Sequence, residues 1–208
     1  MIEVWDLNGH CLEYLDDIHV YLVDGVIVKS VTQILKTKFG GKYDGVSKEV
    51  LQRASERGTA VHSAIENYCK HGVETDDKEL RNFKFLQNAY KFNVVANEIP
   101  VILFMDDVPV CAGRLDMVLE MTETADNGNT TTTKLCLADI KRTATLDKEY
   151  LAYQLNIYRL AYQQCYMRQI DGLKGIHLRD DVRKFVDIPI KEEMTWNFIN
   201  EYVRGVRG

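Results

Sequence analysis

The chain has 208 residues, of which 46% are hydrophobic, 27% charged and 10% aromatic. These values predict one globular domain over residues 1–208 that buries roughly 70% of its unfolded surface, and they exclude a disordered chain. The longest apolar run, residues 99–105, is too short to cross a bilayer, and the acidic start does not resemble a secretion signal. We therefore expect a cytoplasmic protein with no membrane partner.

Cysteine usage and charge restrict the function further. The five cysteines are an odd number without zinc-binding spacing and stand among apolar neighbours, so reduced core thiols are expected. The net charge of −5 counts mildly against a nucleic-acid partner. Between Lys29 and Arg57, however, seven basic side chains face three acidic ones, a local net charge of +4 that suits a phosphate backbone as well as a solvated helix face.

The first half of the chain predicts a hairpin followed by three helices. Residues 19–23 and 26–30 flank Asp24-Gly25, a pair that tolerates positive φ and favours a two-residue turn. Residues 30–33 fit a capping box that starts a short helix, which Gly40-Gly41 ends. Two longer helices are expected, one over residues 47–69 with a candidate break at Gly58 and a terminator at Gly72, and one from a cap at residues 76–79 through Tyr90.

The second half predicts strands and two further helices. Expected strands cover residues 99–105, 108–121 and 134–141, with a turn at Asp106-Asp107 and an exposed hairpin loop over residues 122–133 that contains Asn127-Gly128. A helix over residues 147–168, a hairpin of residues 173–179 and 184–188, and an amphipathic helix after Pro189 complete the chain. Helices surround a central run of strands, so the expected class is α/β with a mixed β-sheet.

The clearest chemical pattern lies on either side of the loop 122–133, with G-R-L-D at residues 113–116 and D-I-K at residues 139–141. If the two strands are antiparallel neighbours, Asp116 and Asp139 lie side by side, and Asp139 shares a strand face with Lys141. Both carboxylates stand in apolar runs, where burying charge is costly unless a cation compensates, and such oxygens suit Mg²⁺ or Mn²⁺. Alone, a D-x-K tripeptide more often marks strand-end aspartates beside a solvated lysine.

Two predicted helices carry polar pairs at a spacing of four residues. His62 and Glu66 share one face among small residues, where a histidine can offer a ring nitrogen to a metal; a hydrogen-bonded core histidine is the alternative. Gln154 and Tyr158 repeat the spacing on an otherwise apolar helix, where they suit a phosphate or the lysine. The alternative is a core tyrosine with its hydroxyl at the rim and a solvated glutamine.

Together these residues form four short motifs in a fixed order: G-x-x-x-H at residues 58–62, G-x-x-D at 113–116, D-x-K at 139–141 and Q-x-x-x-Y at 154–158. In this order, with the opening segments 19–25 and 30–35, the chain resembles the PD-(D/E)XK nuclease superfamily in its RecB-like branch, which includes many bacteriophage exonucleases. The resemblance covers about residues 19–162. It implies a restriction-endonuclease-like core, a central mixed β-sheet flanked by helices.

The resemblance also implies a metal site. His62, Asp116 and Asp139 would be ligands, joined by the main-chain carbonyl of Ile140, for one or two Mg²⁺ or Mn²⁺ ions. Glu66 and Glu98 are further candidates whose membership of this site the sequence leaves open. The scattered cysteines do not match the iron–sulfur members of the branch, so no cluster is expected.

Catalytic and substrate-binding roles follow from the same resemblance. Lys141, acting with Asp116 and Asp139, would position or help deprotonate the attacking water, and Gln154 and Tyr158 would line the path of the DNA. Arg142 departs from the pattern, because relatives often carry a small hydroxyl residue after the lysine, and it is expected to alter phosphate contacts.

The predicted function is therefore an Mg²⁺- or Mn²⁺-dependent deoxyribonuclease, with exonuclease action favoured, for phage-type recombination or DNA processing. DNA is the expected partner, and a recombination protein or further copies of the chain are open additions. The alternative is a catalytically silent nucleic-acid-binding scaffold of the same fold, which has no reason to keep Asp116, Asp139 and Lys141 together. A hydrolase of another phosphodiester, such as RNA, is a third. Exo or endo action, polarity, strand preference and oligomeric state stay open.

Overall fold

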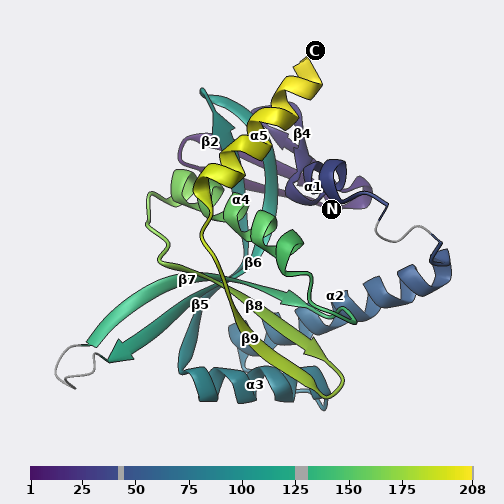
Figure 1. Cartoon of the computed structure of the whole chain (residues 1–208), viewed down its shortest axis with the longest axis vertical. Coiled ribbons are helices and arrows are strands. Elements are labelled where there is room, and N and C mark those ends of the chain that lie inside the picture. The colour runs from purple at the N-terminus through teal and green to yellow at the C-terminus, as the bar shows by residue number, and fades with distance from the viewer. Residues whose placement is uncertain (42–44, 125–130, 208) are drawn as a thin grey trace.

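The computed structural model describes residues 1–41, 45–124 and 131–207, which contain nine strands and five α-helices (Figure 1). The strands form one mixed sheet in the order β1-β2-β3-β4-β6-β7-β8-β9, and β5 pairs with β6 off this path. The predicted α/β class with a central mixed sheet is confirmed. None of the helices in the described part of the chain is long and apolar enough to span a membrane.

The chain begins with four antiparallel strands: β1 (Ile2–Leu7), β2 (His10–Leu15), β3 (Val20–Val23) and β4 (Val26–Ser30). The predicted turn between β3 and β4 is confirmed, with Asp24 at φ 50° and Gly25 at φ 79°. No strand is predicted over residues 2–15. In β1, an edge strand, burial alternates along the strand, but the exposed positions include the apolar Ile2 and Val4, so the hydropathy of the sequence does not alternate with it.

The three helices of the first half begin near the predicted residues, although the N-cap residue of the third, Asp77, makes no side-chain capping hydrogen bond. Ser30 Oγ accepts the Gln33 N–H at 3.1 Å, and the Gln33 side chain accepts the Ser30 N–H at 2.9 Å, so the capping box of α1 (Val31–Phe39) is confirmed. The helix α2 (Lys48–His71) runs through Gly58 without the break considered there, because the glycine fits helical backbone. It ends at Gly72 with φ 68°, and α3 (Lys78–Tyr90) follows.

The central strands are longer than their apolar runs. They are β5 (Phe92–Met105), β6 (Val108–Thr124) and β7 (Thr131–Lys141). Residues 122–124 and 131–133, predicted as loop, belong to strands, because β-branched threonines fit a pleated surface. Asn127-Gly128 lie outside the described residues. The remaining elements match the prediction closely: α4 (Lys148–Tyr166), β8 (Gly172–Arg179), β9 (Val182–Ile188) and α5 (Glu192–Arg207).

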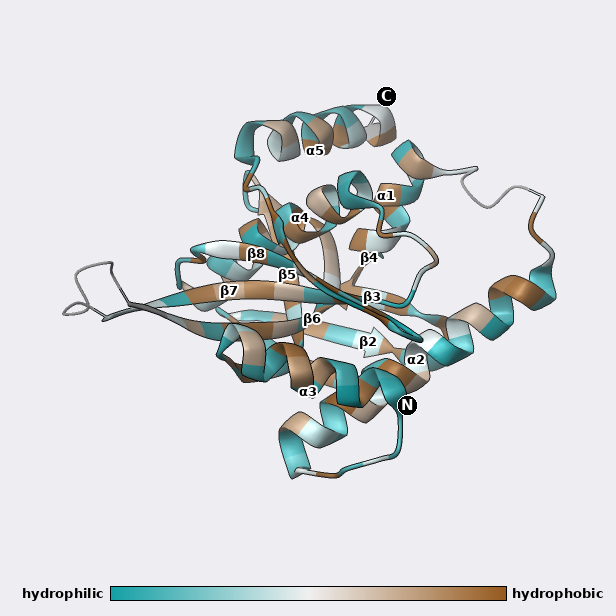
Figure 2. Cartoon of the chain, turned by 60° about the horizontal axis from the view of Figure 1, so that its bottom comes forward, coloured by the Kyte–Doolittle hydropathy of each residue, from teal (hydrophilic) through white to brown (hydrophobic). Residues whose placement is uncertain are grey.

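Helices cover both faces of the sheet (Figures 1 and 2). The larger core contains buried side chains of α1, α4 and α5, and the smaller core contains those of α2 and α3. The strands β5 and β6 supply both, with Ile99 and Leu115 in the larger core and Phe92 and Met117 in the smaller. Beyond Leu115, neighbouring residues of β6 alternate between the two cores, with Met117 in the smaller and Val118 in the larger, because successive side chains of a strand point to opposite faces of the sheet.

One edge of β6 changes partner along its length. β5 occupies the other edge, while β4 pairs in parallel with Cys111 and Ala112, and β7 pairs antiparallel from Met117 onward. Residues 113–116, the G-R-L-D segment, lie between these two pairings. Their backbone groups on this edge must find partners other than a strand.

Arg142 follows β7 and holds three elements together. Its Nε donates to Glu79 Oε1 at 2.8 Å, and an Nη donates to Asp180 Oδ1 at 3.3 Å. The side chains of Arg142 and Glu79 are only 9% and 7% exposed. This arginine therefore links the end of β7 to α3 and to the β8–β9 turn, and its charge is engaged in the fold.

We expect Arg142→Ala to lower the free energy of unfolding by about 3 kcal/mol at about pH 7, because it leaves the Glu79 carboxylate buried without its cation. Burial raises the pKa of Glu79, but the hydrogen bonds from Arg142 and the backbone outweigh it, so the folded-state pKa lies below the usual value. The pair therefore stabilises the fold above that usual pKa, and its contribution is lost as the pH falls through the lowered pKa.

Urea unfolding of both proteins at about pH 7 and below about pH 4 tests this, and the difference between them should shrink at the lower pH. Arg81→Ala is the control, since its ion pair with Asp76 is exposed and should contribute less than about 1 kcal/mol. A difference that does not depend on pH, or an equal loss in the control, would contradict the interpretation.

Candidate functional site

Three acidic residues occupy one row across three neighbouring strands. Glu98 on β5 lies opposite Asp116 on β6, since the residues on either side of both are paired in register. Asp139 on β7 is one step beyond the Met117↔Ala138 pair and so faces Asp116 from the other side. The expectation that Asp116 and Asp139 lie side by side on antiparallel neighbours is confirmed. The sequence left the position of Glu98 open, and the register places it in the same row.

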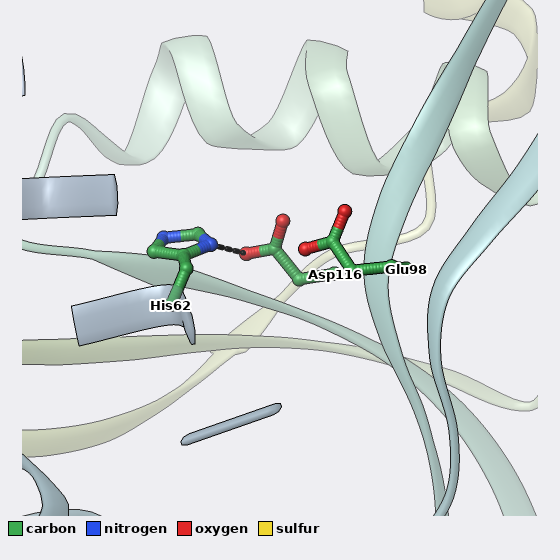
Figure 3. Close-up of side chains that lie close together, drawn as sticks. All are labelled: His62, Glu98 and Asp116. Atoms are coloured by element: carbon green, nitrogen blue, oxygen red, sulfur yellow. Dashed lines mark ion pairs between the residues drawn. The ribbon is translucent and has the colours of Figure 1, made fainter. Parts of the chain in front are cut away.

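A histidine from α2 completes a group of possible metal ligands. His62 Nδ1 lies 3.6 Å from Asp116 Oδ2, and one ligand atom from each of His62, Glu98 and Asp116 lies within 4.8 Å of the others (Figure 3). His62 Nε2 lies 3.0 Å from the Ile140 carbonyl oxygen, which can only accept a hydrogen. Nε2 therefore carries the proton of the neutral ring, and Nδ1 keeps the lone pair that binds a cation.

The backbone of Glu98 is unusual for a strand. Its φ is 50°, in the left-handed region that residues other than glycine seldom adopt. Such conformations persist where the surrounding structure imposes them, often at functional sites. The Glu98 carboxylate is also 3.6 Å from Arg114 Nε, and Arg114 Nη1 donates to Glu3 at 3.0 Å. The backbone conformation and the contact of the side chain with Arg114 therefore both fix the position of Glu98.

The electrostatics of the group favour a bound cation. Burial, and then the charge of Asp139, raise the pKa of Asp116 to about 6, even though Ile140 N donates to Asp116 Oδ2 at 2.6 Å. Burial and Asp116 raise the pKa of Glu98, and the negative charge of Asp116 raises the pKa of His62. These shifts express an excess of negative charge in a partly buried space. The donor set of one imidazole and two carboxylates fits a divalent cation such as Mn²⁺ or Mg²⁺.

Lys141 and Asp139 form a partly buried ion pair next to this group, with the Lys141 side chain 24% exposed. Lys141 Nζ lies 2.7 Å from Asp139 Oδ2, and the Asp139 side chain is 2% exposed. Burial lowers the pKa of Lys141, but Asp139 and Asp116 more than offset it, so the ammonium keeps its charge. The two side chains share one strand face as predicted, and the lysine is not a solvated surface group. The roles of Asp139 and the Ile140 carbonyl as metal ligands stay predictions.

Gln154 and Tyr158 lie in the covered interior of α4. Their exposed fractions are 5% and 6%, which excludes the alternative of a solvated glutamine. Tyr158 packs against Gly113, where an added Cβ would lie 3.1 Å from the tyrosine Cε1. Gln154 Oε1 is buried and has no hydrogen-bond partner among the residues that the structure describes. Their predicted contact with DNA stays a prediction.

Glu66 and Arg114 line the cavity next to His62 but do not belong to the group of possible metal ligands. A cavity of about 340 Å³ is lined by His62, Glu66, Glu98 and Arg114 together with small residues of α2. Glu66 is engaged by Lys70 at 2.5 Å and does not join the three possible ligands. Arg114 was given no role from the sequence, although its place two residues before Asp116 was a usable signal.

Comparison with known proteins adds little to this geometry. No family model matches the chain, and no curated protein matches it. Among solved structures, one described as the crystal structure of SSO0001 is 12% identical, covers 85% of this chain and 75% of its own, and gives a TM-score of 0.44. A TM-score below 0.5 does not establish a shared fold, so the function is argued from the site residues alone.

Two glycines of the motifs should respond in opposite ways to alanine. Gly113→Ala forces its Cβ against Tyr158 and should destabilise the protein by about 1–3 kcal/mol. Gly58→Ala, four residues before His62, meets open space on a helix and should stabilise it by about 0.5–1 kcal/mol. Thermal unfolding of the two variants measures both signs. Equal thermal unfolding midpoints for the two variants would show that Tyr158 leaves room for a Cβ atom at residue 113.

Proposed function

We propose that this chain is a divalent-cation-dependent DNA nuclease of the PD-(D/E)XK superfamily, in the RecB-like branch, with a restriction-endonuclease-like core. The observation that carries the proposal is the partly buried Lys141–Asp139 pair, which adjoins the group of His62, Glu98 and Asp116. A lysine that stays charged beside several carboxylates suits a reaction that builds negative charge on a phosphate and needs a positioned water.

Different residues would bind the cation and position the water and the phosphate. His62, Glu98 and Asp116 would hold a divalent cation, with Asp139 as a further carboxylate beside them. When bound, such a cation lowers the pKa of a water molecule and stabilises charge on the phosphate oxygens. Asp139 orients the Lys141 ammonium, which supplies a fixed positive charge for the water and the phosphate.

The same arrangement argues against a silent scaffold. A buried ion pair contributes little to stability relative to apolar side chains of similar size. Asp116, with its raised pKa, is held ionised at a cost. A protein that only binds DNA gains nothing from these groups, whereas a hydrolase needs them. DNA is the proposed substrate, and a recombination protein or further copies of the chain would supply any processivity.

Lys141→Ala should abolish most cleavage while leaving metal binding intact. Incubation with labelled single- and double-stranded DNA should show cleavage by the wild type in Mn²⁺ or Mg²⁺ and none in EDTA. In single-turnover assays the variant should be slower by at least about 100-fold, since the lost charge acts mainly in the transition state. Lys148→Ala, on the exposed start of α4, is the control. Cleavage by Lys141→Ala within about tenfold of wild type would refute the role of the lysine, a difference of only about 1.4 kcal/mol.

Calorimetric measurement of Mn²⁺ binding should distinguish the roles of Glu98 and Glu66, which both line the cavity next to His62. Glu98→Gln should weaken Mn²⁺ binding by at least about tenfold, because an amide is a weaker ligand than a carboxylate for this ion. Glu66→Gln should bind within about twofold of wild type, since this carboxylate already pairs with Lys70. Equal affinities of the two variants would remove Glu98 from the metal site.

A further inference from the structure

A second cavity is lined by Lys141 and not by His62. Its volume is about 530 Å³. Its apolar lining comes from three helices, with Phe39 on α1, Leu51 on α2 and Tyr150 on α4. Lys141 itself lines this cavity, so the cavity borders the proposed catalytic lysine.

The chemistry of the lining suits a flat, apolar ring attached to an anion. The rings of Phe39 and Tyr150 both line the cavity and lie 5.4 Å apart at 67°, so they meet edge to face. The ammonium groups of Lys36 and Lys141 add positive charge. The carboxylate of Asp147 also lines the cavity, but it accepts the Tyr150 N–H at 3.0 Å and caps α4. Aromatic walls beside cationic groups are how proteins bind the bases of single-stranded nucleic acids.

We propose that this cavity binds one unstacked nucleobase of a single DNA strand, next to the phosphate that Lys141 meets. The proposal rests on the proposed function, which it deepens by naming the form of the substrate. A base inside a duplex is stacked and paired, so it cannot enter a side pocket without leaving the helix. The site therefore takes single strands or the frayed end of a duplex in preference to paired DNA.

The test uses a substitution that fills the cavity with a larger side chain. Leu51→Trp places a larger side chain in the cavity, and Val50→Trp places the same side chain on an exposed position of the same helix. Binding of single-stranded oligonucleotides is measured in EDTA, so that no cleavage occurs. Each oligonucleotide carries one abasic residue, at a different position along the strand.

Wild type and Val50→Trp should lose about tenfold in affinity when the abasic residue falls at one position, a loss within the range for one stacked base. Leu51→Trp should bind the intact strand about tenfold more weakly and should be insensitive to the abasic residue. Thermal unfolding checks that Leu51→Trp is folded, and Leu51→Phe repeats the test with a smaller side chain.

The outcomes separate this inference from the proposed nuclease. If wild type cleaves DNA in Mn²⁺ but Leu51→Trp binds the intact strand as tightly as Val50→Trp, the cavity does not bind a base and the nuclease stands. If the abasic pattern is seen but wild type cleaves nothing, the base pocket stands and the nuclease fails. Equal affinity of wild type for blunt duplex and single strand, or no sensitive position, overturns the inference.

Discussion

The site depends on an interruption in the hydrogen bonding of β6. One edge of this strand leaves β4 after Ala112 and meets β7 only at Met117. Buried backbone groups need partners, and here the Asp116 carboxylate accepts the Ile140 N–H at 2.6 Å where a carbonyl of a regular ladder would stand. The same carboxylate faces His62. The group that closes the sheet at this point is thus also the centre of the proposed metal site.

The sheet also sets the spacing of the charges. Residues opposite each other on adjacent strands have Cβ atoms about 5 Å apart, so one cation can contact carboxylates from two strands. Glu98, Asp116 and Asp139 occupy such a row; the charge of Asp139 adds to the raised pKa of Asp116, and the charge of Asp116 adds to the raised pKa of Glu98. Lys141 neutralises Asp139 from within the chain. The negative charge of Glu98 and Asp116 is left for His62, Arg114 or a bound cation to balance.

Local patterns explain what the sequence could predict. The Asp24-Gly25 turn, the capping box of Ser30, and the shared face of Asp139 and Lys141 each follow from residues at most three apart. Glu98 could not be placed in this way. Its position depends on the register of β5 against β6 and on its own left-handed backbone, which no short pattern contains. The edge strand β1 could not be predicted from its hydropathy, because the apolar Ile2 and Val4 occupy its exposed positions.

The burial of α4 shows how the rest of the fold supports the site. Burying polar side chains in a helix is costly unless each finds a partner. Asn156 does so, through the carbonyls of Ala152 and Pro189. Gln154 Oε1 does not find one in the described part of the chain, although its residue is 5% exposed. Four residues later, Tyr158 packs on Gly113, in the interrupted stretch of β6. Gln154 and Tyr158 are four residues apart and so share one face of the helix. The unpartnered Gln154 oxygen is therefore a cost in stability that α4 carries beside the G-R-L-D segment.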